Sequence, residues 1–189
     1  DAIVMAAAVI NSLQTLVSRC ISPLDSAVLT LGTIHGGTAG NIVAAETEMT
    51  GTLRTTDPAV REKIIDAMTR QVSCTCQAMG GSGEVVIVPG YAALINSDEN
   101  VDVLVEKDEE VLGSQHIHPK KFPSLGVEDF SFFLEKAKGV FYHLGCANRE
   151  KGITAPLHSQ DFDIDEECLK LGVQLQAQLA LKLLKRDIA

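Results

Sequence analysis

One histidine near the C-terminus stands where it could bind a metal ion. His158 lies in the segment 155–167 (APLHSQDFDIDEE), after a proline that keeps the chain extended and before a long apolar pattern that predicts a helix. Asp165 can cap that helix, and Glu166 and Glu167 suit its positive N-terminal end. A histidine held in this way can offer a ring nitrogen to a metal. Because a loop histidine is more often a surface residue, the pattern alone leaves both interpretations open.

Arg54 stands at the end of an alternating segment, directly before a predicted helix start at Asp57. A guanidinium fork in this place could hold a carboxylate through paired hydrogen bonds. The alternative is a surface arginine that pairs with an acid. Gly37 and Asn41 belong to a glycine-broken loop with one amide side chain, which by itself indicates a hairpin loop.

Two adjacent carboxylates, Glu128 and Asp129, begin a short helical pattern. Such a pair could support a metal ligand through hydrogen bonds or bind a substrate amine. It could equally consist of helix N-terminal acids that the helix dipole favours. The residues themselves do not separate these roles.

Four collinear segments resemble one enzyme family, the N-acyl-amino-acid amidohydrolases such as hippurate hydrolase and aminoacylase, in the superfamily of dinuclear metallopeptidases that includes carboxypeptidase G. The segments are spread along most of the chain, at residues 32–42 (GTIHGGTAGNI), 51–58 (GTLRTTDP), 126–131 (GVEDFS) and 156–167 (PLHSQDFDIDEE). The first departs from the family after Asn41, where IVAAE replaces a common Val-Ile-Pro-Asp. The resemblance implies hydrolysis of N-acyl amino acids or related amide conjugates.

The resemblance also implies a site. It assigns His158 as a metal ligand, Arg54, Asn41 and Gly37 as substrate-binding residues, and the two acids of the third segment as neighbours of the metal ligands. The family holds two divalent metal ions (Zn, Mn, Co or Ni), and the remaining ligands and the general base come from N-terminal motifs that this chain does not contain. We therefore expect no catalytic residue here, and an isolated chain that is inactive.

The hydrophobic pattern of the first half alternates between helical and strand periods. It predicts a helix, two strands, a helix and a strand, at residues 2–19, 27–34, 46–55, 58–79 and 84–88. This order is a split βαβ arrangement, or ferredoxin-like fold, that lacks its first strand. By the resemblance, residues 1–95 form a lid or dimerisation domain truncated at its N-terminus.

The second half, residues 96–189, reads as alternating helices and a strand. Helices are expected at residues 98–112, 128–137 and 166–185, with a strand at 140–144. One strand cannot form a complete sheet for these helices. We therefore expect the C-terminal part of a larger α/β metallopeptidase catalytic domain.

Composition limits the partners. The 189 residues carry a net charge of −9, which argues against nucleic acid, and no apolar run is judged long enough to span a membrane. Five irregularly spaced cysteines indicate free thiols in a reducing compartment, hence a cytoplasmic protein. The expected partners are a small N-acyl amino acid substrate and a second copy bound through the lid. The competing function is a non-catalytic dimerisation or interaction module.

Overall fold

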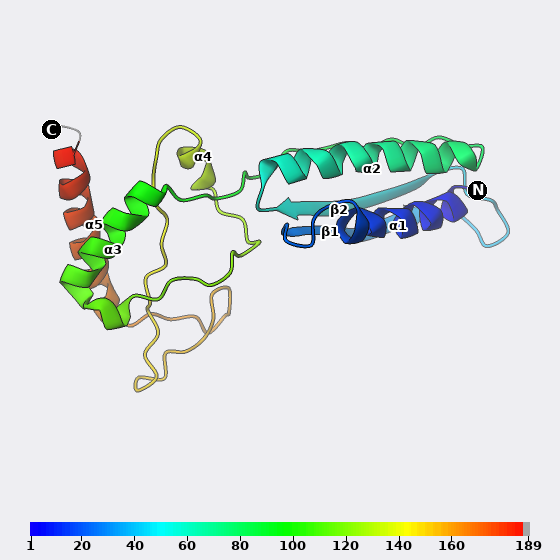
Figure 1. Cartoon of the computed structure of the whole chain (residues 1–189). Helices are drawn as coiled ribbons and strands as arrows, with labels where there is room; N and C mark the ends of the chain where they lie inside the picture. The colour runs from blue at the N-terminus through cyan, green and yellow to red at the C-terminus, as the bar shows by residue number, and fades with distance from the viewer. Residues whose placement is uncertain (187–189) are drawn as a thin grey trace. The chain divides into compact units, whose positions relative to one another are not determined.

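The computed structural model describes residues 1–186, which form two compact units of helices and one small sheet (Figure 1). Unit 1 contains Asp1–Leu94 and Pro123–Asp129, whereas unit 2 contains Ile95–Phe122 and the chain from Phe130 onward. A short segment from the second half of the sequence is therefore part of unit 1. The mixture of helices with a small sheet agrees with the expected α and β content.

Unit 1 consists of two helices and a β-hairpin: α1 (Ala2–Arg19), β1 (Ala27–Gly36), β2 (Thr47–Thr55) and α2 (Pro58–Ala78). Both helices begin at an aspartate cap. The Asp1 carboxylate accepts the amide of Ile3 at 3.0 Å, and the Asp57 carboxylate accepts the amide of Ala59 at 2.7 Å. The four predicted elements are confirmed, with small shifts at their ends.

β1 and β2 form a two-stranded antiparallel sheet. Its register runs from Ala27 opposite Thr55 to Gly36 opposite Thr47, with a bulge at Gly32. The two strand backbones approach closely beside the bulge. A Cβ atom at Gly51 would therefore collide with the carbonyl oxygen of Thr30. Alternate side chains of each strand face the helices, so the other face of the sheet is open.

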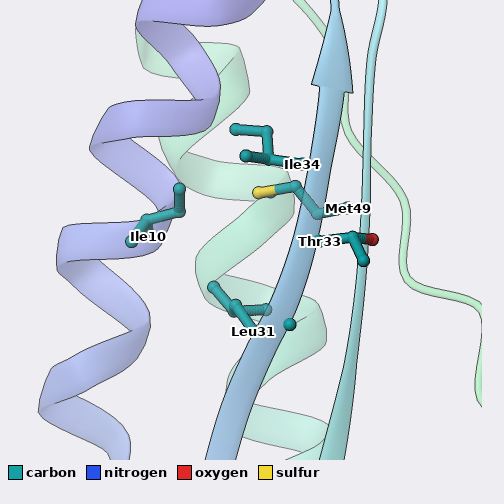
Figure 2. A pocket seen from close by; sticks show the side chains of 6 residues that line it. Ile10, Leu31, Thr33, Ile34 and Met49 are labelled. Atoms are coloured by element: carbon teal, nitrogen blue, oxygen red, sulfur yellow. The ribbon is translucent and has the colours of Figure 1, made fainter.

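The core of unit 1 lies between the two helices and one face of the sheet (Figure 1). Leu16 is fully buried and Ile64 is 1% exposed. A pocket of about 150 Å³ remains between Ile10 of α1 and the sheet (Figure 2). Apolar side chains line most of it, so it is a packing gap under the helix. The buried residues of the core are Val9, Leu13, Leu16, Val60, Ile64, Ala67, Met68, Val72 and Cys76.

Helix α1 meets the length and composition of a membrane span, with a mean hydropathy of 1.4 over 18 residues. The sequence prediction that no segment reaches this limit was therefore wrong. Four residues of α1 are buried inside unit 1: Ala6, Val9, Leu13 and Leu16.

The predicted strand at residues 84–88 is wrong, since this segment joins no sheet in the described chain. Val85 packs against the core, whereas Val86 and Val88 are 78% and 83% exposed. A strand is stabilised by hydrogen bonds to a partner, and its apolar sequence cannot supply that partner. The segment therefore remains unpaired among the described residues.

Unit 2 contains α3 (Asp98–Leu112), the short 3₁₀ helix η1 (Ser114–His116), α4 (Ser131–Leu134) and α5 (Glu167–Arg186). α3 packs against α5, and their contact buries Val103, Leu104 and Leu179. Lys182 of α5 donates a 2.9 Å hydrogen bond to Glu106 of α3. The predicted helices at 98–112 and 166–185 are confirmed.

Two expectations for unit 2 were wrong. The helix expected at 128–137 is reduced to the four residues of α4, and the strand expected at 140–144 forms no ladder in the described chain. Residues 140–144 are instead held in unit 2 by side-chain hydrogen bonds and packing. Asn96 donates to the Phe141 carbonyl at 2.9 Å and accepts its amide at 2.8 Å, and Tyr142 packs on the α3–α5 contact.

Candidate functional site

His158 occupies a strained position in a tight turn of unit 2. The carbonyl of Pro156 accepts the amide of Ser159 at 3.2 Å, so Leu157 and His158 are the central residues of the turn. His158 has a φ of 64°, which suits the third residue of a type II turn, where glycine is usual. Within residues 1–186, it is the one non-glycine residue with a positive φ. Such strain costs about 1–3 kcal/mol and often marks a functional residue.

The loop that carries His158 is closed at its base by backbone hydrogen bonds. Asn148 and Ile153 exchange two of 2.8 Å, and the amide of Asp165 donates to the carbonyl of Cys146 at 2.8 Å. The side-chain oxygen of Asn148 also accepts the amide of Lys151 at 3.1 Å. The exposed turn at His158 therefore belongs to a loop with a braced base.

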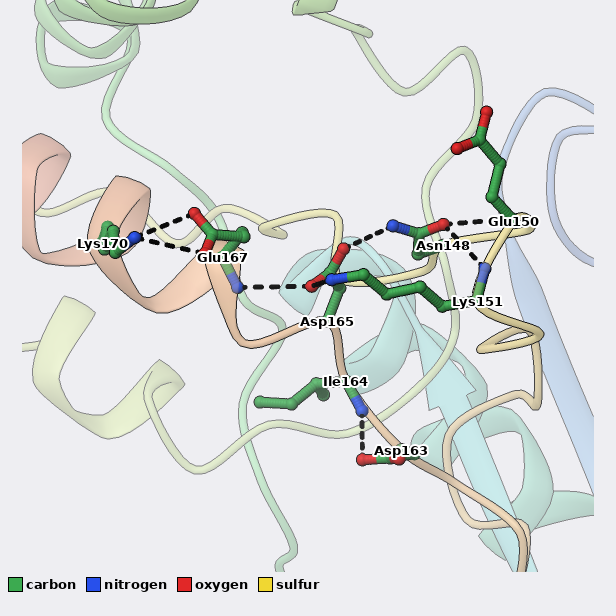
Figure 3. A network of polar contacts seen from close by, with 8 residues as sticks. All are labelled: Asn148, Glu150, Lys151, Asp163, Ile164, Asp165, Glu167 and Lys170. Atoms are coloured by element: carbon green, nitrogen blue, oxygen red, sulfur yellow. Dashed lines mark hydrogen bonds and ion pairs between the residues drawn. The ribbon is translucent and has the colours of Figure 1, made fainter.

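Asp165 is the charged centre of that base (Figure 3). Its carboxylate accepts Nζ of Lys151 at 2.7 Å, Nδ2 of Asn148 at 2.5 Å and the amide of Glu167 at 3.4 Å. These donors, Lys151 foremost, lower the pKa of Asp165 to about 2. The same hydrogen bond raises the pKa of Lys151. The contact with Glu167 at the start of α5 supports the expected capping role of Asp165.

Gly37 and Asn41 lie in the loop that joins β1 to β2. Gly37 has a φ of 79°, which glycine adopts without strain. The carbonyl of Ala44 accepts the amide of Ala2 at 3.0 Å, so the loop is tied to α1 without the proline common in the family pattern. The loop surrounds a pocket of about 250 Å³, lined by Gly37, Thr38, Ile42, Val43, Ala44, Ala45 and Glu46. Asn41 is exposed and does not line it.

Arg54 lies on the open face of the sheet at the end of β2. It pairs with Val28 in the ladder, and the adjacent Leu53 packs into the core on the other face. Its Nη1 donates a 2.7 Å hydrogen bond to the carbonyl oxygen of Leu125. The alternative of a surface arginine paired with an acid is not what the structure has, since among the described residues Arg54 makes no ion pair.

Glu128 and Asp129 lie in the segment of unit 1 that contacts Arg54. Glu128 is half-buried, whereas Asp129 is exposed. Both precede α4, whose four residues make too short a helix for a strong dipole. The helix-dipole explanation for this acidic pair is therefore weakened.

The predicted residues thus fall into two groups, with His158 in unit 2 and the other five in unit 1. Within residues 1–186, no three histidine, cysteine, aspartate or glutamate side chains come together to hold a metal ion. A single imidazole does not fit a two-metal centre, which needs several ligands for each ion.

A polar group that the sequence analysis missed lies inside unit 2. One carboxylate oxygen of Asp108 is buried without a hydrogen-bond partner in the described chain, and burial raises the pKa of this carboxyl group. Burial and the charge of Asp108 also raise the pKa of Tyr142, whose hydroxyl bonds to Gln176. A signal existed, because Asp108 stands four residues after the buried Leu104 on the inward face of α3.

Comparison with known proteins matches this architecture to one group of hydrolases. The profile of peptidase family M20/M25/M40 matches residues 7–182. The chain is 38% identical to thermostable carboxypeptidase 2 of Saccharolobus solfataricus. The matched region covers 96% of this chain and 46% of the carboxypeptidase. The chain is 33% identical to an N-acetyldiaminopimelate deacetylase of Bacillus licheniformis, covering 93% of this chain and 45% of the deacetylase.

A solved structure shares the fold. The YXEP protein of Bacillus subtilis, described as a dinuclear metal binding peptidase of the M20 family, superposes with a TM-score of 0.81 at 28% identity, over 98% of this chain and 46% of that one. The chain spans about half the length of each of these relatives. Since the family profile covers nearly all of its residues, the chain belongs to peptidase family M20/M25/M40.

Proposed function

We propose that this chain is part of a metal-dependent amidohydrolase that cleaves N-acyl amino acids or related amide conjugates. Family membership supports hydrolysis of an amide bond. The relatives are named a carboxypeptidase and a deacetylase of an acylated amino acid, and both names describe cleavage of an amide whose nitrogen belongs to an amino acid. Such substrates carry a free carboxylate, for which an arginine fork is a suitable partner. Unit 1 would be the lid: its helix, hairpin and helix have the order of a ferredoxin-like domain that lacks its first strand, and residues 84–88, where the last strand was expected, are unpaired.

The observation that carries the site assignment is the strained turn at His158. Its positive φ is maintained by a loop braced at Asn148, Ile153 and Asp165, and its side chain is exposed. Proteins retain such strain where a side chain needs a particular position. We assign His158 as one metal ligand, with the other ligands supplied by a part of a longer protein outside this chain. Bound divalent ions would activate water and polarise the amide carbonyl.

Metal binding and turnover test the assignment in a full-length protein that carries this chain. We expect His158→Gly to lose metal in elemental analysis and to lower kcat on N-acetyl-methionine by at least about a hundredfold. Glycine accommodates the positive φ, so the melting temperature should be retained. The control is His118→Ala, at an exposed histidine with no assigned role, which should change neither quantity.

Full metal content and wild-type turnover in His158→Gly would show that His158 is not a metal ligand. The 189-residue chain alone should not hydrolyse N-acetyl-methionine with added Zn²⁺, Mn²⁺, Co²⁺ or Ni²⁺. Chelator-sensitive turnover by the chain alone would refute the division of ligands. A full-length protein that retains no metal and hydrolyses none of these amides would instead favour an interaction module.

A further inference from the structure

The segment Pro123–Asp129, here named the strap, belongs to unit 1 although it lies between α3 and α4 in the sequence. It has no regular secondary structure. Leu125 and Glu128 are its half-buried residues, and the other strap residues are exposed. The strap therefore has little apolar burial to hold it in place.

Arg54 supplies a directed contact to this segment. Its Nη1 lies 2.7 Å from the carbonyl oxygen of Leu125, across a sequence separation of 71 residues. The ladder with Val28 and the packing of Leu53 fix the backbone of Arg54, so its guanidinium extends from a rigid part of unit 1. A hydrogen bond from a charged donor is shorter and stronger than one between neutral groups.

We propose that Arg54 is a positioning residue that latches the strap to the sheet. Its hydrogen bond fixes the Leu125 carbonyl three residues before Glu128, and thereby sets the position of Glu128 and Asp129. The latch rests on the observed contact, and its consequence for turnover rests on the proposed function. A latch differs chemically from a carboxylate clamp, because a carbonyl needs one donor whereas a carboxylate is best held by two.

Backbone order parameters measured by NMR on the ¹⁵N-labelled 189-residue chain test the latch. In the wild type, we expect the amides of residues 124–129 to give S² values of about 0.85, like those of β2. In Arg54→Met, these S² values should fall below about 0.6. The amide resonance of Gly126, which follows the Leu125 carbonyl, should change its chemical shift. Arg54→Lys should keep the strap ordered, because lysine can still donate one hydrogen bond.

The matched control is Arg70→Met on the exposed side of α2, which should leave the strap unchanged. Strap amides that are mobile in the wild type would overturn the latch, as would an ordered strap in Arg54→Met. If Arg54→Met does not fold, the wild-type values and Arg54→Gln decide the question. Glutamine retains one donor, so an Arg54→Gln strap that is mobile in a folded unit 1 would mean that the positive charge is needed.

Kinetics in a full-length protein separate the latch from the proposed carboxylate contact. If Arg54 acts as a latch alone, Arg54→Lys should retain the wild-type KM for both carboxylate and carboxamide substrates. If it also clamps the carboxylate, Arg54→Lys should raise KM about tenfold for the carboxylate substrate and leave the carboxamide unaffected. The order parameters test the latch independently, so inactivity of the full-length protein would not decide it.

Discussion

The two units differ in how completely their own elements cover apolar surface. Among the described residues, the core cluster of unit 1 contains nine buried residues of α1 and α2, whereas the cluster at the α3–α5 contact of unit 2 contains three. Helix α5 is apolar on a second side as well, where Val173 is 71% exposed and Leu181 is 60% exposed. A helix that is apolar on opposite sides is typical of the interior of a larger domain. The difference teaches that helix formation is local, whereas a core requires enough elements to surround it.

The largest expected effect on stability comes from the same leucine-to-alanine substitution made in both cores. Leu16→Ala in unit 1 should lower the free energy of unfolding by about 3–5 kcal/mol, because Leu16 is fully buried in the larger cluster. Leu179→Ala in unit 2 should cost about 2–3 kcal/mol, because the thinner core around it can relax. Urea unfolding that is monitored by hydrogen exchange, with peptides assigned to each unit, measures the loss of unfolding free energy in both variants. Equal losses would remove the distinction between the two cores.

A smaller effect concerns the charge inside unit 2. Asp108→Asn should raise the melting temperature at pH 7 by about 1–3 °C, because burial raises the pKa of Asp108 and so makes its ionised form unfavourable in the folded state. The gain should disappear below pH 3.8, the ordinary pKa, where the carboxyl group is protonated in both folded and unfolded chains. Asp102→Asn, at an exposed position of the same helix, is the control. A lower melting temperature for Asp108→Asn would show that the carboxylate has a partner that stabilises it.

The sequence predicted those elements whose formation depends on residues that are near one another in the chain. Asp57 followed by Pro58 predicted the start of α2, and the helical apolar period predicted α1, α3 and α5. Residues 84–88 were predicted as a strand because their apolar pattern is typical of one, yet a strand needs a partner that no local pattern specifies. The fold was therefore predictable where hydrogen bonds close within a helix or a hairpin.

The candidate site was predictable in its residues but not in its geometry. His158 could be identified from a motif, whereas its positive φ could not, since turns usually place glycine there. The contact of Arg54 with Leu125 joins two motifs that are far apart in the sequence, and no periodicity connects them. Asp108 was missed because it lies in an acidic stretch that reads as a solvated helix face.

The smallest expected effect sharpens the contrast between the thin core of unit 2 and its well-bonded loop base. An NMR titration of the Asp165 carboxyl carbon should give a pKa of about 2, and Lys151→Met should move it toward 3.8, because Lys151 is the principal donor. A depressed carboxyl pKa contributes stability that is complete above 3.8 and is lost as the pH falls toward about 2. The turn at His158 should therefore loosen in that interval in the wild type, while Lys151→Met loosens at higher pH. If the titration of Asp165 is the same in both proteins, Asn148 and the amide of Glu167 hold the carboxylate without help from the lysine.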